Sequence, residues 1–243
     1  MEGLGLLKNL TYFGEDYRHC IVDQPNLLSN LTRLADIHDD KARERLSAVF
    51  RNMTLSTDIR FRLAQRADIL TAFIRMAGRC CARYHNLAKQ STMHEDVSNN
   101  KKTLRNFLSF VTSLAMDGNS ASSLVCHGDG MLVEQLKRYV AYEEDAVVRK
   151  RAARSLRLLA RDFSSNTVAT PVVLLLQDNC LLEVLSERAL LDSDHTVRVE
   201  AAEAFAQCAV LVRASMPQHN AVLDTLAQLA LKTTITPRAG ISP

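Results

Sequence analysis

The stretch that decides the fold is Arg151-Ala-Ala-Arg-Ser-Leu-Arg-Leu-Leu-Ala160. Its last six residues form a hexad, which consists of any residue, an apolar residue, two unrestricted residues, an apolar residue and a small residue. Apolar side chains spaced three apart lie on one face of a helix. The hexad occurs five times, at residues 6–11, 49–54, 110–115, 155–160 and 204–209. The sequence therefore contains a repeated amphipathic helix.

A second element follows each copy of the hexad. It is a pair of apolar residues, a short break and a further apolar segment, as in Leu63-Ala64 followed by Ile69-Leu70. Short amphipathic helices of this kind cannot bury their apolar faces alone, but stacked neighbours share one continuous core. The low contents of glycine (8) and proline (5) also favour helices joined by short links. The sequence predicts an all-α repeat protein.

The residues around the hexad resemble a known family. The stretch 151–160 looks like the third helix of an armadillo repeat, and the break followed by two leucines looks like the first helices of the next repeat. Asp145-Ala-Val-Val-Arg149 and Asp194-His-Thr-Val-Arg198 are similar to the related HEAT repeats. The resemblance covers most of residues 4–232. It implies a right-handed superhelical solenoid of about four to five repeats with a concave groove that binds a peptide segment.

The hexad spacing sets the expected boundaries. Repeat units are predicted at approximately 1–40, 41–77, 103–145, 146–193 and 194–232. The interval between the second and third hexads is longer than the others, so residues 78–102 are predicted to be an insertion, with a mobile loop over the polar residues 90–102. Residues 233–243 contain three turn-forming residues and few apolar anchors, and we expect a disordered tail there.

A basic stripe is the first candidate for a binding site. Lys150, Arg154, Arg157 and Arg161 have offsets of 0, 4, 7 and 11, which place them on one helix face. Guanidinium groups in a row can hold carboxylates or phosphates through forked hydrogen bonds. Two alternatives are a solvated face and pairing between repeat units. In the second alternative the repeat register matches Arg154 with Glu203, and Arg151 with Glu200.

Two asparagines are the second candidate. By the armadillo resemblance, Asn9 and Asn52 stand where a groove asparagine holds the backbone of a bound peptide, and an amide can both donate and accept hydrogen bonds. The alternative is an ordinary surface amide. Arg45 and Arg51, near Asn52, join the predicted partner-binding set. The chain has no tryptophan, which argues against the binding of nuclear localisation signals. The same position holds Ser113, Leu158 and Gln207 in the other copies, so the asparagine does not recur along the whole array of repeats.

Motifs for catalysis or metal binding are weak. Cys80 and Cys81 with His85 and His94 match no standard zinc spacing. The adjacent residues of Cys126-His127-Gly-Asp129 cannot converge as a nucleophile, base and carboxylate, and the glycines there indicate a turn. The sequence contains no Gly-rich phosphate loop and no nucleophile elbow. We therefore expect no enzyme activity, no cofactor and no metal.

Charge and hydropathy narrow the class of protein. The net charge of +3 argues against general nucleic-acid binding, and no apolar run is long enough for a membrane span. No signal peptide is apparent, so we expect a cytoplasmic or nuclear location. The leading hypothesis is a scaffold or adaptor that binds an acidic or phosphorylated protein segment. The alternatives are a structural subunit that uses the ends or outer face of the stack, and nucleic-acid binding through the basic stripe.

Overall fold

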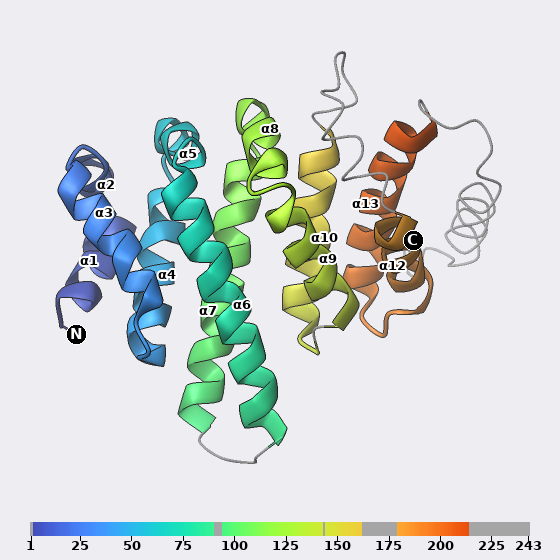
Figure 1. The fold of residues 1–243 in the computed structure, drawn as a ribbon, viewed down its shortest axis with the longest axis horizontal. Coiled ribbons are helices and arrows are strands. Elements are labelled where there is room, and N and C mark those ends of the chain that lie inside the picture. The colour runs from blue at the N-terminus through green and yellow to red at the C-terminus, as the bar shows by residue number, and fades with distance from the viewer. Residues whose placement is uncertain (1, 90–93, 143, 162–178, 214–243) are drawn as a thin grey trace, which may run out of the picture. The chain divides into compact units, whose positions relative to one another are not determined.

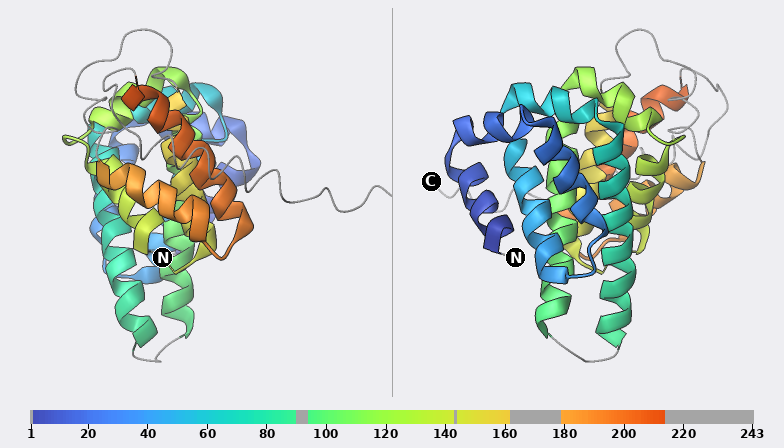
Figure 2. Two further views of the ribbon diagram at one scale, coloured as in Figure 1. Left: turned by 90° about the vertical axis from the view of Figure 1, so that its right-hand side faces the viewer. Right: turned by 60° about the vertical axis from the view of Figure 1, so that its left-hand side comes forward.

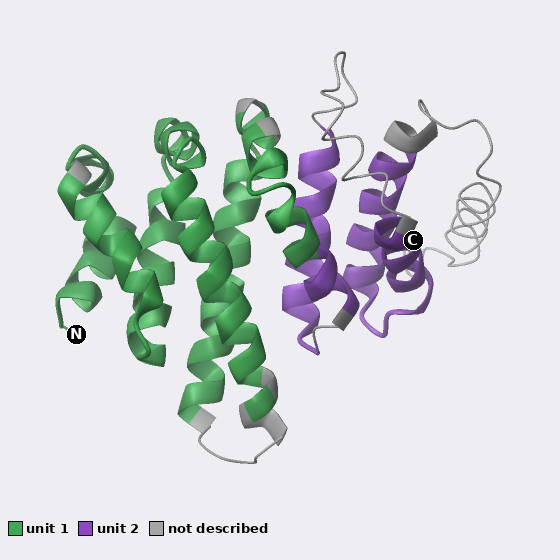
Figure 3. Cartoon of the chain, viewed as in Figure 1, with its two compact units in different colours: residues 1–136 green, residues 137–243 purple. Residues whose placement is uncertain are grey.

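The computed structural model describes residues 2–89, 94–142, 144–161 and 179–213. These residues form twelve α-helices and one 3-10 turn, which confirms the predicted all-α class (Figure 1). The chain divides into two compact units, residues 1–136 and 137–243 (Figure 3). In the described ranges no helix is both long enough and apolar enough to cross a membrane.

In unit 1 a triplet of helices recurs. Each triplet has a short first helix, a second helix and a third helix that carries the hexad. The triplets are α2-α3-α4 and α5-α6-α7; α1 precedes them and α8 and the start of α9 follow. The bounds are α1 (Glu2–Phe13), α2 (Glu15–Val22), α3 (Pro25–Arg33), the 3-10 turn η1 (Leu34–Asp36), α4 (Asp40–Met53), α5 (Thr57–Ala64), α6 (Ala67–Lys89), α7 (His94–Ala115), α8 (Gly118–Cys126) and α9 (Met131–Tyr142).

Helices of the same kind pack on one another within unit 1. The helices that carry the hexads, which we call hexad helices, pack in the order α1, α4 and α7. The second helices α3 and α6 also pack together, and the short first helices α2, α5 and α8 follow one another along one edge of the unit (Figure 1). Each triplet therefore buries its apolar faces against the equivalent helices of its neighbour.

The hexad positions belong to the cores of both units. In the four copies from residue 49 onward, the two apolar residues and the small residue of the hexad are buried. In the first copy, only Thr11 is buried. Phe50, Phe73 and Phe110 form an aromatic cluster in which the ring centroids are 4.4 Å apart for Phe50–Phe73 and 5.5 Å apart for Phe73–Phe110. The cluster joins α4, α6 and α7, and therefore joins the two triplets.

The links between helices follow local capping rules. Pro25 occupies the first turn of α3, and the carboxylate of Asp39 accepts a hydrogen bond from the backbone N–H of Ala42 (2.6 Å) at the start of α4. The predicted turn between α8 and α9 is present. Gly128, Asp129 and Gly130 there have φ values of 56°, 55° and 88°, a left-handed conformation that glycine adopts without strain and that aspartate tolerates.

The predicted loop over residues 90–102 is wrong from His94 onward, because α7 begins there; residues 90–93 lie outside the described residues. Within this segment Asn100 is fully buried, and its amide nitrogen donates to Asp40 Oδ2 (2.9 Å). Asp40 Oδ2 is also 2.9 Å from Arg83 Nε, and the other oxygen of Asp40 binds Arg43. A buried polar cluster therefore anchors the segment. Helices α6 and α7 lie side by side and extend beyond α3 and α4 (Figures 1 and 2).

In unit 2 the hexad helices α10 (Ala146–Arg161) and α13 (His195–Arg213) pack together, and α12 (Asn179–Leu191) packs on α13. A buried ion pair links them. Arg149 Nε lies 2.7 Å from Asp192 Oδ2, and Arg149 Nη2 lies 2.8 Å from Asp192 Oδ1. Asp192 is in the link between α12 and α13, so this forked pair fixes that link against α10. The predicted tail, residues 233–243, lies outside the described residues.

Candidate partner-binding surface

The helix α10 carries an unusual excess of positive charge. It has six basic residues and no acidic residue. Arg149 belongs to the buried pair with Asp192. Lys150, Arg154, Arg157 and Arg161 instead lie on the side of α10 that is not buried, where Arg154 and Arg161 are exposed and the other two are half-buried. The four stripe residues therefore share one face of α10, which we call the α10 basic face.

Arg157 is part of the packing between α10 and α13. Its guanidinium group forms an ion pair with Glu203 and lies 3.4 Å from Glu200 Oε2. The side chain of Glu200 is only 12% exposed, so this pair is partly shielded from water. Pairing between hexad helices therefore accounts for Arg157. The predicted register was one helical turn wrong, since it matched Glu203 with Arg154.

Arg154 has the greatest potential to bind a partner. It is exposed between Lys150 and Arg157 on the same face of α10. The pKa of Asp194 is lowered mainly by hydrogen bonds from Thr196, and the charge of Lys150 contributes to the same shift. The positive charge of Lys150 therefore acts on Asp194, the residue that precedes α13. Of these two cations, Arg154 is the more exposed to solvent, and a guanidinium group can bind a carboxylate or phosphate through two parallel hydrogen bonds.

The unit 1 candidates Asn52 and Arg51 have internal roles. Asn52 is 2% exposed, and its amide nitrogen donates to the backbone oxygen of Lys8 (3.0 Å). Its amide oxygen accepts a hydrogen bond from Arg51 Nη2 (2.9 Å), and Arg51 Nη1 donates to Asn106 Oδ1 (2.8 Å). These bonds connect α1, α4 and α7. The polar groups of Asn52 and Arg51 that were predicted to bind a partner are therefore used in hydrogen bonds between packed helices.

The other two unit 1 candidates lie on hexad helices. Asn9 is exposed on α1, and Arg45 is half-buried on α4. The guanidinium group of Arg45 lies beside Gly5 of α1, and a Cβ atom added at Gly5 would be 3.7 Å from the guanidinium carbon, which is an ordinary van der Waals contact. The eight predicted residues thus divide between the units, with Asn9, Arg45, Arg51 and Asn52 in unit 1 and Lys150, Arg154, Arg157 and Arg161 in unit 2.

An apolar surface on α1 and α2 was missed by the sequence analysis. Leu6, Tyr12, Phe13 and Tyr17 are at least half exposed, and Phe13 is 82% exposed. The rings of Tyr12 and Phe13 pack edge to face, with centroids 5.0 Å apart. One signal in the sequence points to this surface, because the three aromatic residues lie outside the hexad.

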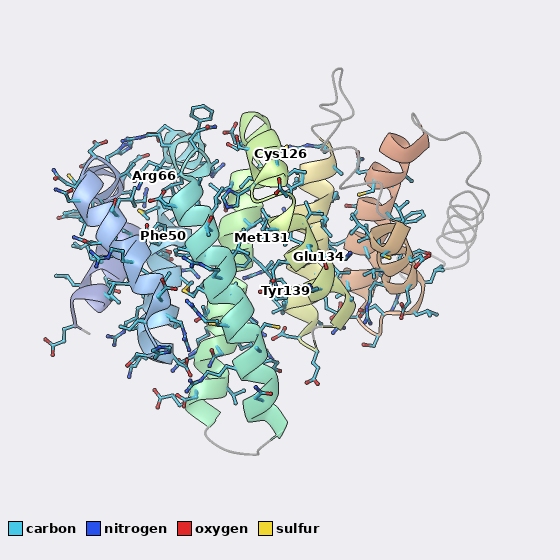
Figure 4. The ribbon with its side chains drawn as sticks, viewed as in Figure 1. Phe50, Arg66, Cys126, Met131, Glu134 and Tyr139 are labelled. Atoms are coloured by element: carbon cyan, nitrogen blue, oxygen red, sulfur yellow. The ribbon has the colours of Figure 1, made fainter. Side chains whose placement is uncertain are left out.

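Cys126 and His127, which the sequence analysis considered as a catalytic pair, lie in different surroundings. Cys126 is exposed at the end of α8 (Figure 4), whereas the ring of His127 lies 2.9 Å from Thr71 Oγ1 of α6. Partial burial lowers the pKa of His127, which favours the neutral imidazole. His127 therefore links the α8–α9 turn to α6. The side chains of His85 and His94, considered with Cys80 and Cys81, lie outside the described residues; Cys80 itself is buried.

Comparisons with known proteins give a likeness of fold. No family model matches the chain, and no curated protein matches it. Among solved structures, the chain is similar to the crystal structure of an engineered protein from the Northeast Structural Genomics Consortium. The sequence identity is 17%, the match covers 95% of this chain and 88% of that chain, and the TM-score is 0.55. At this identity the similarity concerns the fold alone.

Proposed function

We propose that this chain is a non-catalytic protein-interaction module of armadillo-like repeats, and that its α10 basic face binds an acidic or phosphorylated segment of a partner protein. The repeat assignment is supported by the recurring helix triplet in unit 1 and by the buried hexad positions in both units. The binding assignment depends on one observation. The helix α10 has six basic residues and no acidic residue, and Arg154 is exposed on it.

The chemistry of the α10 basic face favours an extended, negatively charged ligand. Arg154 supplies a planar donor for a carboxylate or phosphate, and Lys150 supplies a second positive charge one helical turn away. A single exposed ion pair contributes only about 0–1 kcal/mol in water. Useful affinity therefore requires several contacts along the helix, which an extended segment with repeated acidic groups can provide.

Selection from a random peptide library on the immobilised full-length chain tests this proposal. We expect the enriched peptides to be rich in Asp, Glu or phosphorylated residues. Their binding, measured by fluorescence anisotropy at physiological salt, should be lost in Arg154→Glu. The matched control is Arg33→Glu, which makes the same charge change at an exposed site on α3 in unit 1. Circular dichroism should show equal helix content in the three proteins.

Two results would contradict the proposal. One is the enrichment of peptides without acidic character, and the other is equal binding of acidic peptides to Arg154→Glu and to the wild-type chain. Nucleic-acid binding is tested in the same assay with a single-stranded oligonucleotide. It would appear as oligonucleotide affinity that falls steeply as salt rises, because phosphate contacts release counterions.

A second candidate function is that of a structural subunit that docks through α1 and α2. The exposed Leu6, Tyr12, Phe13 and Tyr17 favour it, since Tyr12 and Phe13 pack against each other and exposed apolar patches are typical of protein contacts. A photo-crosslinking amino acid at Tyr17 tests this function, with the same amino acid at Arg33 as the control. Reproducible capture of one protein from Tyr17 alone would support the second candidate, and equal labelling from both sites would exclude it.

A further inference from the structure

Three side chains with metal-binding atoms converge on one surface of unit 1. Glu15 and His19 come from α2, and Asp58 comes from α5. One carboxylate or imidazole atom from each residue lies within 4.8 Å of the corresponding atoms of the other two. Among the described residues, these three form the one group of at least three histidine, cysteine or acidic side chains whose ligand atoms lie this close together. None of the three residues belongs to the α10 basic face.

The repeat packing explains why the three residues meet. Glu15 and His19 are four residues apart and therefore lie one above the other on one face of α2. The short helices α2 and α5 pack side by side as the first helices of successive triplets, and Asp58 is in the first turn of α5. Arg18 fixes this pairing, because its Nε donates to Ser56 Oγ (2.8 Å) and its Nη1 donates to the backbone oxygen of Thr11 (2.9 Å).

The separation of His19 and Asp58 suits two ligands of one ion. His19 Nδ1 lies 3.5 Å from Asp58 Oδ2. A good N–H···O hydrogen bond is about 2.7–3.2 Å long, so this distance is too long for one. Zinc ligands lie about 2.0–2.1 Å from the metal, and two of them at a tetrahedral angle are about 3.4 Å apart. The observed distance therefore matches the spacing of two tetrahedral zinc ligands.

We propose that Glu15, His19 and Asp58 form a binding site for a divalent transition-metal ion, with Zn²⁺ as the preferred ion. An imidazole nitrogen and carboxylate oxygens are common zinc ligands, and the two carboxylates balance the charge of the ion. Glu15 and Asp58 are exposed and His19 is half-buried, so their side chains can adjust around the ion from the solvent side. Bound zinc connects the first helices of two successive triplets and thereby stabilises the folded unit.

Isothermal titration with Zn²⁺ tests the site in the full-length chain after treatment with a chelator. Every protein carries Cys20→Ser, because Cys20 is exposed and adjacent to His19 and its thiol can also bind zinc. We expect saturable zinc binding that weakens by at least about tenfold in His19→Ala and in Asp58→Asn. The matched control is His38→Ala, which removes another exposed histidine of unit 1 and should leave the affinity unchanged.

A thermal unfolding experiment gives a second readout. Zinc should raise the melting temperature of the Cys20→Ser protein and of the His38→Ala control, and this increase should disappear in His19→Ala. Absence of zinc binding in the Cys20→Ser protein would overturn the proposal, as would equal affinity in His19→Ala. Either result would leave an ordinary ion pair between His19 and Asp58. The outcome is independent of the proposed function, which is tested at Arg154 in unit 2.

Discussion

Arg51 and Arg157 occupy the same position, the third residue, in two copies of the hexad, and both reach across to the next hexad helix. Arg51 Nη1 donates to Asn106 Oδ1 (2.8 Å) between α4 and α7, and Arg157 pairs with Glu203 between α10 and α13. Lys8 has the third position in the first copy, and its Nζ lies 3.0 Å from Glu44 Oε1 of α4. A cation at this hexad position therefore connects neighbouring helices.

This connection predicts different roles for two arginines on one face of α10. Arg157→Met should lower the free energy of unfolding by about 1 kcal/mol, because it removes a partly shielded ion pair with Glu203 and Glu200. Arg154→Met should change it by less than about 0.5 kcal/mol, as is usual for an exposed site. Urea unfolding followed by circular dichroism measures both values. Equal effects of the two substitutions would show that Arg157 does not stabilise the packing.

The pair between Arg149 and Asp192 should be the most sensitive ionic contact of unit 2. The side chains of Arg149 and Asp192 are 8% and 0% exposed. Arg149→Met should cost about 3–5 kcal/mol, since it leaves a buried carboxylate with fewer partners. The double variant Arg149→Met/Asp192→Leu should be more stable than Arg149→Met alone, because it also removes that carboxylate. A double variant that is no more stable than the single variant would contradict this explanation.

The same carboxylate predicts a pH dependence. Burial tends to raise the pKa of Asp192, but the hydrogen bonds from Arg149 and from the Asp194 backbone N–H, with the charges of Arg149 and Arg188, lower it overall. A carboxyl group whose pKa is lower in the folded state stabilises the protein above its unfolded pKa of about 4, and this contribution is lost as the pH falls through the folded pKa.

We therefore expect Asp192→Asn to be less stable than the wild-type chain at pH 7, and we expect this difference to shrink below about pH 4. Urea midpoints at pH 7 and pH 3 provide the comparison. A difference that stays constant between the two pH values would mean that the charge of Asp192 does not contribute to stability.

The polar segment at the start of α7 should contribute to the stability of unit 1. Asn100→Ala removes the hydrogen bond to Asp40 and should lower the free energy of unfolding by about 1–3 kcal/mol. Lys102→Ala, at an exposed position of the same helix, should have an effect within about 0.5 kcal/mol. Hydrogen exchange at the backbone of residues 96–102 provides a second measurement, with faster exchange expected in Asn100→Ala. Similar exchange in both variants would indicate that Asn100 does not anchor the segment.

The periodic part of the fold could be predicted from the sequence because burial follows the hexad. Met53, Leu114 and Leu159 fill the same hexad position in three copies, and all are fully buried. Helix propensity and periodicity are local properties, so they are visible in one sequence. The all-α class and the places of the five hexad helices followed from these signals.

The rest of the fold and of the candidate site could not be predicted, because it depends on contacts between residues that are far apart in the sequence. The segment around Asn100 was interpreted as a loop because it is polar, and its buried partner Asp40 lies far away in the sequence. The offsets of the basic stripe identified one face of α10. They did not show that the helix crossing places Glu203 beside Arg157. The group of Glu15, His19 and Asp58 was also missed, because it forms only when α2 packs on α5.

The length of the hairpin formed by α6 and α7 affects how repeats are counted. These helices have 23 and 22 residues, whereas the equivalent α3 and α4 have 9 and 14. The added turns of α6 and α7 extend beyond α3 and α4, while Phe73 and Phe110 still pack against Phe50 of the preceding triplet. Dividing the number of residues by an average period therefore overcounts the repeats. One helix pair of such a protein can therefore extend further into solvent while the order and spacing of the packed helices stay unchanged.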